Sequence, residues 1–167
     1  MSITLHQTSI PVLIHGLQTL STLLDKAEQH ADEHKLDPQQ LIGARLYEDM
    51  FPLSGQIQRA SDTAKATATR LSGAAAPSFA DEEVSFDDLQ QRINKTIVFL
   101  ESVTADQVDG QEQREVKMKL RGEERVMTGQ DYLLQFGLPN FLFHVTTAYG
   151  ILRNQGVKLG KMDFLGL

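Results

Sequence analysis

The sequence predicts an all-α protein, a four-helix bundle with a small β-hairpin inserted before the last helix. Apolar residues recur three or four positions apart in four long segments, which is the period of amphipathic helices. Between residues 106 and 127 the pattern changes to alternation, which indicates strands. The chain has 167 residues, 41% of them hydrophobic and 23% charged, so we expect one domain, 1–167, with one core.

The first helix follows an apolar stripe that begins at Ile10 and ends at Ala31. Thr4 and Gln7 have the spacing of a capping box, which places the start of helical structure before the stripe. Because Pro11 lacks a backbone donor, we expect the helix to bend or restart at this residue. The stripe consists of Ile10, Leu13, Leu17, Leu20, Leu24, Ala27 and Ala31.

The second long helix is predicted from about Met50 to Leu71, and Gly73 is the expected stop signal. Before it, Asp37 followed by Pro38 predicts a cap and the first turn of a short helical piece. The apolar face of the long helix is rich in alanine, so a neighbouring helix can approach it closely.

The third long helix follows a surface connection. Residues 73–83 have no apolar period and contain glycine, proline and clustered acids, which is typical of a loop. Ser85 and Asp88 then form a capping signal, and the helix is expected to end near Val103. Its apolar face consists of Phe86, Leu89, Ile93, Ile97 and Leu100.

The hairpin and the fourth long helix complete the chain. Apolar residues alternate with lysine over 116–120, residues 121–124 have the composition of a turn, and Val126 is expected on a return strand. Thr128 and Asp131 predict the cap of a helix that runs to about residue 154 and bends around residues 137–139. The remaining tail is punctuated by glycine, and we expect it to be irregular.

The fourth helix contains an uncharged stretch, Tyr132 to Leu152. Its glutamine, proline, asparagine, histidine and threonine residues make it a poor membrane span, because polar groups are costly in lipid. We therefore expect no membrane interaction and interpret the stretch as the most buried helix of a soluble bundle.

Composition excludes several classes of function. The 16 basic and 22 acidic residues give a net charge of -6, the wrong sign for a protein that binds phosphates, so we expect no nucleic-acid partner. The absence of cysteine excludes thiolate metal sites and a cysteine nucleophile. The first residues lack the basic start and cleavage site of a signal peptide, so a cytoplasmic location is expected.

His144 is the most informative residue of the sequence. It shares one face of the uncharged helix with Asn140 and Thr147, and polar side chains on a face expected to be buried need partners. One interpretation is a ligand or metal pocket, with His144 as the candidate metal ligand. The other is a structural histidine that is hydrogen-bonded to a side chain of the second long helix.

Two other pairs of polar residues stand at suggestive spacings. Asp49 and Gln56 lie two turns apart on the second long helix and are candidate ligand-binding partners of His144, although Asp49 is as easily a helix cap. His30 and His34 have the four-residue spacing of zinc ligands, but they lie in a charged segment, where a solvated helix end explains them.

A set of motifs is spread over nearly the whole chain. They are Ala44-Arg45-Leu46, Asp49-Met50-Phe51-Pro52-Leu53 with Gln56, Leu138-Pro139-Asn140-Phe141 with Phe143-His144, Tyr149 with Leu152-Arg153 and Gly156-Val157, and Gly160-Lys161 with Asp163-Phe164-Leu165-Gly166. With these motifs the sequence resembles an uncharacterised branch of the DinB/YfiT-like superfamily. The resemblance implies a four-helix bundle that often forms dimers.

The resemblance also implies a comparison with better-known relatives. These proteins bind a divalent metal with three histidines, and some of the proteins transfer low-molecular-weight thiols. Two of those histidines are separated by three residues on the fourth helix, and the third is on the second helix. His144 matches one fourth-helix position, but the positions four earlier and four later hold Asn140 and Ala148. The second helix offers Asp49 or Gln56 and no histidine.

Two functions follow as expectations. The first is a small-molecule-binding or assembly protein without the three-histidine metal site. The alternative is a divalent-metal thiol transferase with a site remodelled around His144, for which zinc, nickel or manganese would be the candidate metals. We also expect a homodimer, with Ala60, Ala64 and Ala68 as candidates for the contact, unless these alanines pack inside their own chain.

Overall fold

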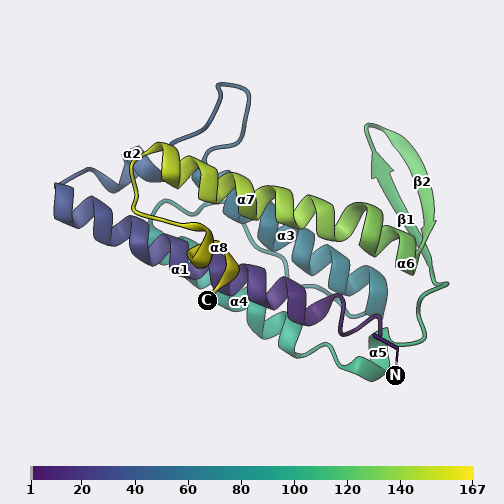
Figure 1. Cartoon of the computed structure of the whole chain (residues 1–167). Coiled ribbons are helices and arrows are strands. Elements are labelled where there is room, and N and C mark those ends of the chain that lie inside the picture. Colours follow the sequence, from purple (N-terminus) through teal and green to yellow (C-terminus); the bar gives the residue numbers. More distant parts are fainter. Residues whose placement is uncertain (1) are drawn as a thin grey trace.

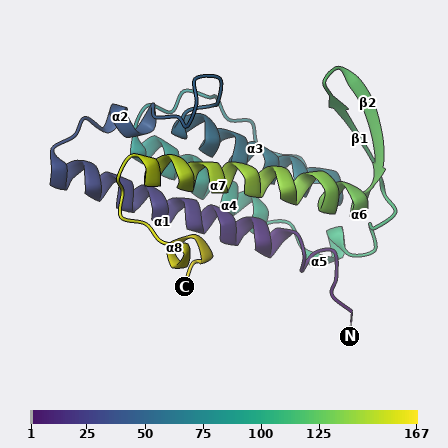
Figure 2. The ribbon, with the colours of Figure 1, turned by 45° about the horizontal axis from the view of Figure 1, so that its top comes forward.

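The structure is a computed structural model and describes residues 2–167, in which four long helices form the main body of the fold. They are α1 (Ile10–His34), α3 (Leu53–Ser72), α4 (Phe86–Glu101) and α7 (Leu138–Asn154), and they lie side by side (Figures 1 and 2). The main packed pairs are α1 with α4, α4 with α3, α3 with α7, and α7 with α1. In this arrangement α1 and α3 are opposite each other and not adjacent. The segment that joins α1 to α3 therefore crosses the end of the set of helices.

Seven shorter elements connect and flank the long helices within residues 2–167. The two strands pair antiparallel in a hairpin, so the expectation of a mainly helical protein with one small hairpin is confirmed. The shorter elements are α2 (Pro38–Ile42), α5 (Ala105–Val108), β1 (Glu115–Leu120), β2 (Glu123–Thr128), α6 (Gly129–Tyr132), the π-helix η1 (Leu133–Gly137) and α8 (Lys161–Leu165).

Local signals explain where α3 ends and α4 begins. Gly73 ends α3 with a positive φ of 80°, a conformation that glycine adopts without steric cost. Before α4, the Ser85 hydroxyl accepts from the backbone N–H of Asp88 at 3.1 Å, and the Asp88 carboxylate accepts from the backbone N–H of Ser85 at 3.0 Å. Both features were predicted from the sequence, and both are confirmed.

The hairpin turn is shorter than the predicted 121–124. Only Arg121 and Gly122 lie between the strands, and their φ values are 53° and 86°. Positive φ at both positions is what a two-residue turn needs in order to match the twist of the strands. The hairpin and the 44–52 loop project from the same side of the helices (Figure 1).

The starts of two long helices differ from the prediction. Thr4 and Gln7 do hydrogen-bond each other's backbone, but they close a turn that precedes α1. Pro11 occupies the first turn of α1, where no backbone donor is needed, so of the two predicted alternatives the helix starts at this point after the preceding turn. Helix α3 starts at Leu53, because Met50 belongs to the 44–52 loop.

The predicted irregularity of the fourth helix takes the form of a π-helical turn. Pro139 cannot donate to the carbonyl four residues earlier, which explains why the wider turn η1 lies immediately before α7. Gly137 at this point packs against Thr67 of α3, leaving little room for a side chain. After α7 the tail is not fully irregular, since α8 forms one turn whose start is held by the Asp163 carboxylate on the Gly160 N–H.

One prediction about burial is wrong, and for the alanines of α3 the second of the two alternatives, packing inside their own chain, is the one present. The uncharged stretch is not uniformly buried, since Leu134, Leu142 and Phe143 are exposed on its outer face. In contrast, the alanines proposed as a dimer contact are completely buried inside the chain, where α3 packs against its neighbours: Ala60, Ala64 and Ala68. Among residues 2–167, no helix is long and apolar enough to cross a membrane.

Candidate functional site

His144 lies at the seam between α7 and α3. Its side chain is 8% exposed, and its Nδ1 is 2.8 Å from Oε1 of Gln56, which is 1% exposed. The two residues are 88 positions apart in the sequence, and the packing of α3 against α7 brings them together. The hydrogen bond from His144 to the second long helix, one of the two interpretations of this residue, is therefore present. The other interpretation, a ligand pocket, would place the ligand at the same seam.

The Gln56 amide determines which nitrogen of His144 carries the proton. Gln56 Nε2 donates to the backbone carbonyl of Phe51 at 3.0 Å, so its amide group is fixed with the oxygen toward His144. An amide oxygen only accepts hydrogen bonds, so His144 Nδ1 must donate, and Nε2 of the neutral ring keeps a free lone pair. The ring is thereby a hydrogen-bond acceptor toward its surroundings.

The second ring nitrogen of His144 is available. Nε2 has no hydrogen-bond partner among residues 2–167 and, unlike the buried Nε of Arg92, stays accessible to solvent. Burial lowers the pKa of His144 from its usual 6.5 to about 4, and the positive charge of Arg59 acts in the same direction. The ring is therefore neutral at physiological pH.

Aromatic and charged side chains surround this seam. The ring of Phe143 meets the His144 ring edge-on, with centroids 5.3 Å apart, and the Arg59 guanidinium lies 5.8 Å from the centre of the Phe51 ring. Phe51 and Phe143 are both 55% exposed. Arg59 is itself paired with Asp81 at 2.5 Å, so its charge is largely compensated.

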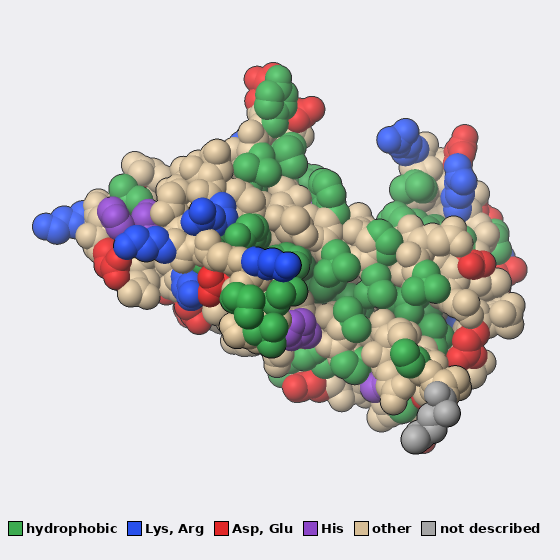
Figure 3. All heavy atoms as spheres, in the orientation of Figure 1, with side chains coloured by type: hydrophobic (Ala, Val, Ile, Leu, Met, Phe, Trp, Pro, Cys, Tyr) green, Lys and Arg blue, Asp and Glu red, His purple; other side chains and the backbone are tan. Residues whose placement is uncertain are grey.

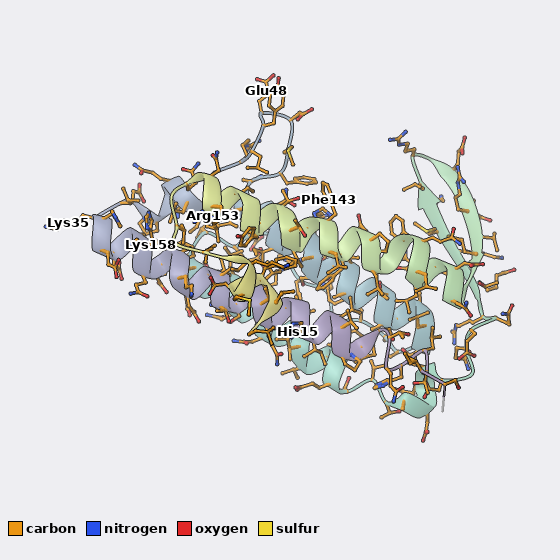
Figure 4. The ribbon with its side chains drawn as sticks, in the orientation of Figure 1. His15, Lys35, Glu48, Phe143, Arg153 and Lys158 are labelled. Atoms are coloured by element: carbon orange, nitrogen blue, oxygen red, sulfur yellow. The ribbon has the colours of Figure 1, made fainter. Side chains whose placement is uncertain are left out.

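A hollow lies next to the seam. Figure 3 shows it between the 44–52 loop and the hairpin, with hydrophobic side chains on its floor. Phe143 points into this space from α7, near the base of the loop that carries Glu48 at its tip (Figure 4). The polar seam around His144 thus borders an apolar surface.

The other candidate residues are not joined to His144. The amide of Asn140 donates to the hydroxyl of Thr63 on α3 at 2.8 Å, and the Thr147 hydroxyl donates to the Phe143 carbonyl at 2.7 Å. Asp49 lies exposed in the 44–52 loop and makes no side-chain hydrogen bond or ion pair within residues 2–167. It therefore does not cap α3, whose first turn follows Pro52.

The residues present do not fit a three-ligand metal site. Zinc and related ions take three or more protein ligands in such sites, and no group of three His, Cys, Asp or Glu within residues 2–167 is arranged to hold one. The Gln56 oxygen already accepts from His144. His30 and His34 stack on each other at the end of α1, with centroids 4.2 Å apart, and form no such group either.

Sequence reasoning missed three contributors to the seam: Phe51, Arg59 and Thr63. A signal existed for two of them, because Arg59 and Thr63 follow Gln56 by three and seven residues and so share its helix face. Phe51 carried no comparable signal, since its role comes from a backbone carbonyl in an irregular loop.

A separate cavity of about 400 Å³ lies beneath the 73–84 connection, against α4. Arg92, only 2% exposed, bonds Asp62 at 2.9 Å, Asp81 at 2.9 Å and Glu83 at 2.8 Å. Burial opposes ionisation of Glu83, but hydrogen bonds from Arg92 and Gln58 outweigh it and hold the pKa of Glu83 below its usual value. This network attaches the connection to the helices.

Comparison with known proteins agrees with the fold. A crystal structure described as a DinB family member protein from Shewanella denitrificans is 35% identical to the chain, with a TM-score of 0.92. The match covers 98% of this chain and 92% of that chain. No curated protein matches the chain.

The helical fold and this likeness define the chain as a DinB-like protein. More narrowly, it belongs to the family described as a domain of unknown function, DUF1993, whose model matches residues 5–165. The resemblance read from the sequence motifs is therefore confirmed.

Proposed function

We propose that the protein binds a small molecule at the α3–α7 seam around His144, without the three-histidine metal site of its better-known relatives. The observation that carries this proposal is the fixed Gln56–His144 pair, which leaves Nε2 as a neutral acceptor with solvent access. A few placed polar groups among apolar and aromatic side chains are a common element of ligand sites. The proposed polar side of the site consists of His144, Gln56, Asn140 and Thr147. Asp49 is the proposed ligand-binding residue of the neighbouring 44–52 loop.

The proposed scaffold is a single four-helix bundle. The cyclic packing of α1, α4, α3 and α7 supports it, since each of these helices buries one face against two neighbours. Bundle proteins commonly place ligand sites between facing helices, as the seam would here.

Equilibrium dialysis with zinc, nickel and manganese, followed by elemental analysis, tests the metal-free part of the proposal. We expect no stoichiometric metal in the wild-type protein at micromolar concentration. A stoichiometric metal that His144→Ala removes would contradict the proposal and restore the alternative, a divalent-metal thiol transferase. His30→Ala is the matched control, because any metal held at the end of α1 would be lost in that variant instead.

We also propose that the protein pairs as a homodimer through the outer face of α7. Leu142 is 41% exposed there, and Leu134 in the preceding turn η1 is 54% exposed. The stretch from Tyr132 to Leu152 has no charged residue. A chain of net charge -6 repels its own copies, and an uncharged strip is a place where two copies can meet at low electrostatic cost. Figure 3 shows the hydrophobic side chains that gather along α7.

A further inference from the structure

The chemistry of the seam also restricts the kind of molecule that it can hold. His144 Nε2 can only accept a hydrogen bond, because the Phe51 carbonyl fixes the Gln56 amide and the Gln56 oxygen fixes the proton on Nδ1. A ligand group that meets Nε2 must therefore bring its own hydrogen. Hydroxyl and amide N–H groups have one, whereas a carboxylate or an ether oxygen has none.

The charges around the seam do not favour an anion. Arg59 is the cation whose charge acts on His144, and its guanidinium is paired with Asp81 at 2.5 Å and with Asp62 at 3.4 Å. Its remaining face lies against the ring of Phe51. An incoming anion would have to compete with two carboxylates that are already in place, and it would find a neutral imidazole at His144.

The walls of the seam favour an aromatic or apolar body. Phe143 and Phe51 each expose more than half of their surface; the Phe143 ring meets the His144 ring, and Phe51, whose ring lies near Arg59, contacts Gln56 through its backbone carbonyl. Exposed aromatic side chains provide large contact areas and stack edge-on or offset with other rings. Hydrophobic side chains also form the floor of the neighbouring hollow in Figure 3, so the surroundings suit an uncharged group better than a charged one.

From these three features, and resting on the proposed function, we infer that the ligand is a neutral molecule with an aromatic or apolar body and one hydrogen-bond donor, such as an aromatic alcohol. The donor meets Nε2 of His144, and the body lies between Phe51 and Phe143. Gln56 acts as a positioning residue, since it holds the ring in the tautomer that accepts.

Three small probes of similar shape test this inference: phenol, anisole and benzoate. Each is titrated into the wild-type protein at pH 7, and the backbone amide signals of Gln56 and His144 are followed by NMR, with Lys35 at the far end of α1 as an internal control (Figure 4). We expect phenol to bind about tenfold more tightly than anisole or benzoate, the difference that one hydrogen bond to an open acceptor makes. The Lys35 signal should not move.

The variant Gln56→Glu provides a second readout. A carboxylate also accepts from Nδ1, but its negative charge favours the doubly protonated ring, which donates through Nε2. The preference should therefore move from phenol toward benzoate. If the variant does not fold, the wild-type titrations decide the inference by themselves.

The possible failures are distinct. If phenol binds no better than anisole, or if benzoate binds best to the wild-type protein, the inference is wrong and the proposed ligand site remains. If none of the three probes moves the signals of Gln56 and His144, both the inference and the proposed site are overturned.

Discussion

Gln56 Oε1 accepts a hydrogen bond from His144 Nδ1 at 2.8 Å, and this contact joins α3 to α7 where both side chains are buried. The same glutamine donates to the Phe51 carbonyl at 3.0 Å, so one amide connects two helices and the 44–52 loop. Both polar atoms of this amide make hydrogen bonds. Removing the amide would therefore leave His144 Nδ1 and the Phe51 carbonyl without a partner.

Replacing Gln56 by methionine keeps the volume of the side chain and removes both hydrogen bonds. We expect Gln56→Met to lower the free energy of unfolding by about 1–3 kcal/mol, the cost of leaving buried polar groups unsatisfied. Urea denaturation measures this change. Gln18→Met at an exposed position of α1 should change stability by less than about 0.5 kcal/mol, and equal effects of the two substitutions would contradict the role assigned to Gln56.

The pH dependence of stability should report on His144. Its pKa is lowered to about 4 in the folded chain, so below the usual value of 6.5 the unfolded chain binds more protons and stability falls as the pH falls. The loss lies between about pH 6.5 and 4, and none arises from this group above pH 7. After allowance for solvent access at Nε2, we expect the free energy of unfolding to fall by about 1–2 kcal/mol over this range.

The difference in unfolding free energy between wild type and His144→Gln isolates this effect, because all other groups titrate in both proteins. It should decrease between pH 7 and pH 4.5. A difference that stays constant over this range would show that His144 titrates normally in the folded state.

Arg92 should be essential for attaching the 73–84 connection. Arg92→Met removes the buried cation shared by Asp62, Asp81 and Glu83. Only Glu83 among these is largely buried, so we expect a cost of about 1–3 kcal/mol. Lys95→Met, one turn further along α4 at an exposed position, should cost less than about 0.5 kcal/mol. Urea denaturation compares the two, and limited proteolysis should cut the connection faster only in the Arg92 variant.

The proposed dimer can be tested by the mass of the protein in solution. Light scattering over a concentration series should give twice the chain mass for the wild type and the single-chain mass for Leu142→Glu, because a carboxylate on the α7 face would be buried against its own copy. Val98→Glu, on the exposed side of α4, should remain dimeric. A single-chain mass for the wild type at every concentration would refute the dimer.

Local features of this fold could be predicted from the sequence because they depend on neighbours in the chain. Ser85 with Asp88 caps α4, and Gly73 ends α3, as their residue types require. The start of α3 was misplaced because Met50 continues the apolar spacing. In the folded chain the Leu53 N–H instead bonds the Ala44 carbonyl at 2.9 Å, which closes the 44–52 loop.

The site was only partly predictable, for a different reason. A histidine in an uncharged helix must find a polar partner, so a link from His144 to the second long helix could be anticipated. The choice of Gln56 over Asp49, and of Thr63 as the partner of Asn140, depends on the register of α3 against α7. That register comes from packing across the core, which no local pattern encodes.

The protonation state of the His144 ring tests the account most directly. Long-range proton–nitrogen NMR of the labelled protein at pH 7, with His144→Gln to assign the signals, distinguishes the protonated from the unprotonated ring nitrogen. We predict a proton on Nδ1, a free lone pair on Nε2, and no change on addition of one equivalent of zinc. A proton on Nε2, or a zinc-dependent shift of Nε2, would contradict a metal-free acceptor site held in place by Gln56.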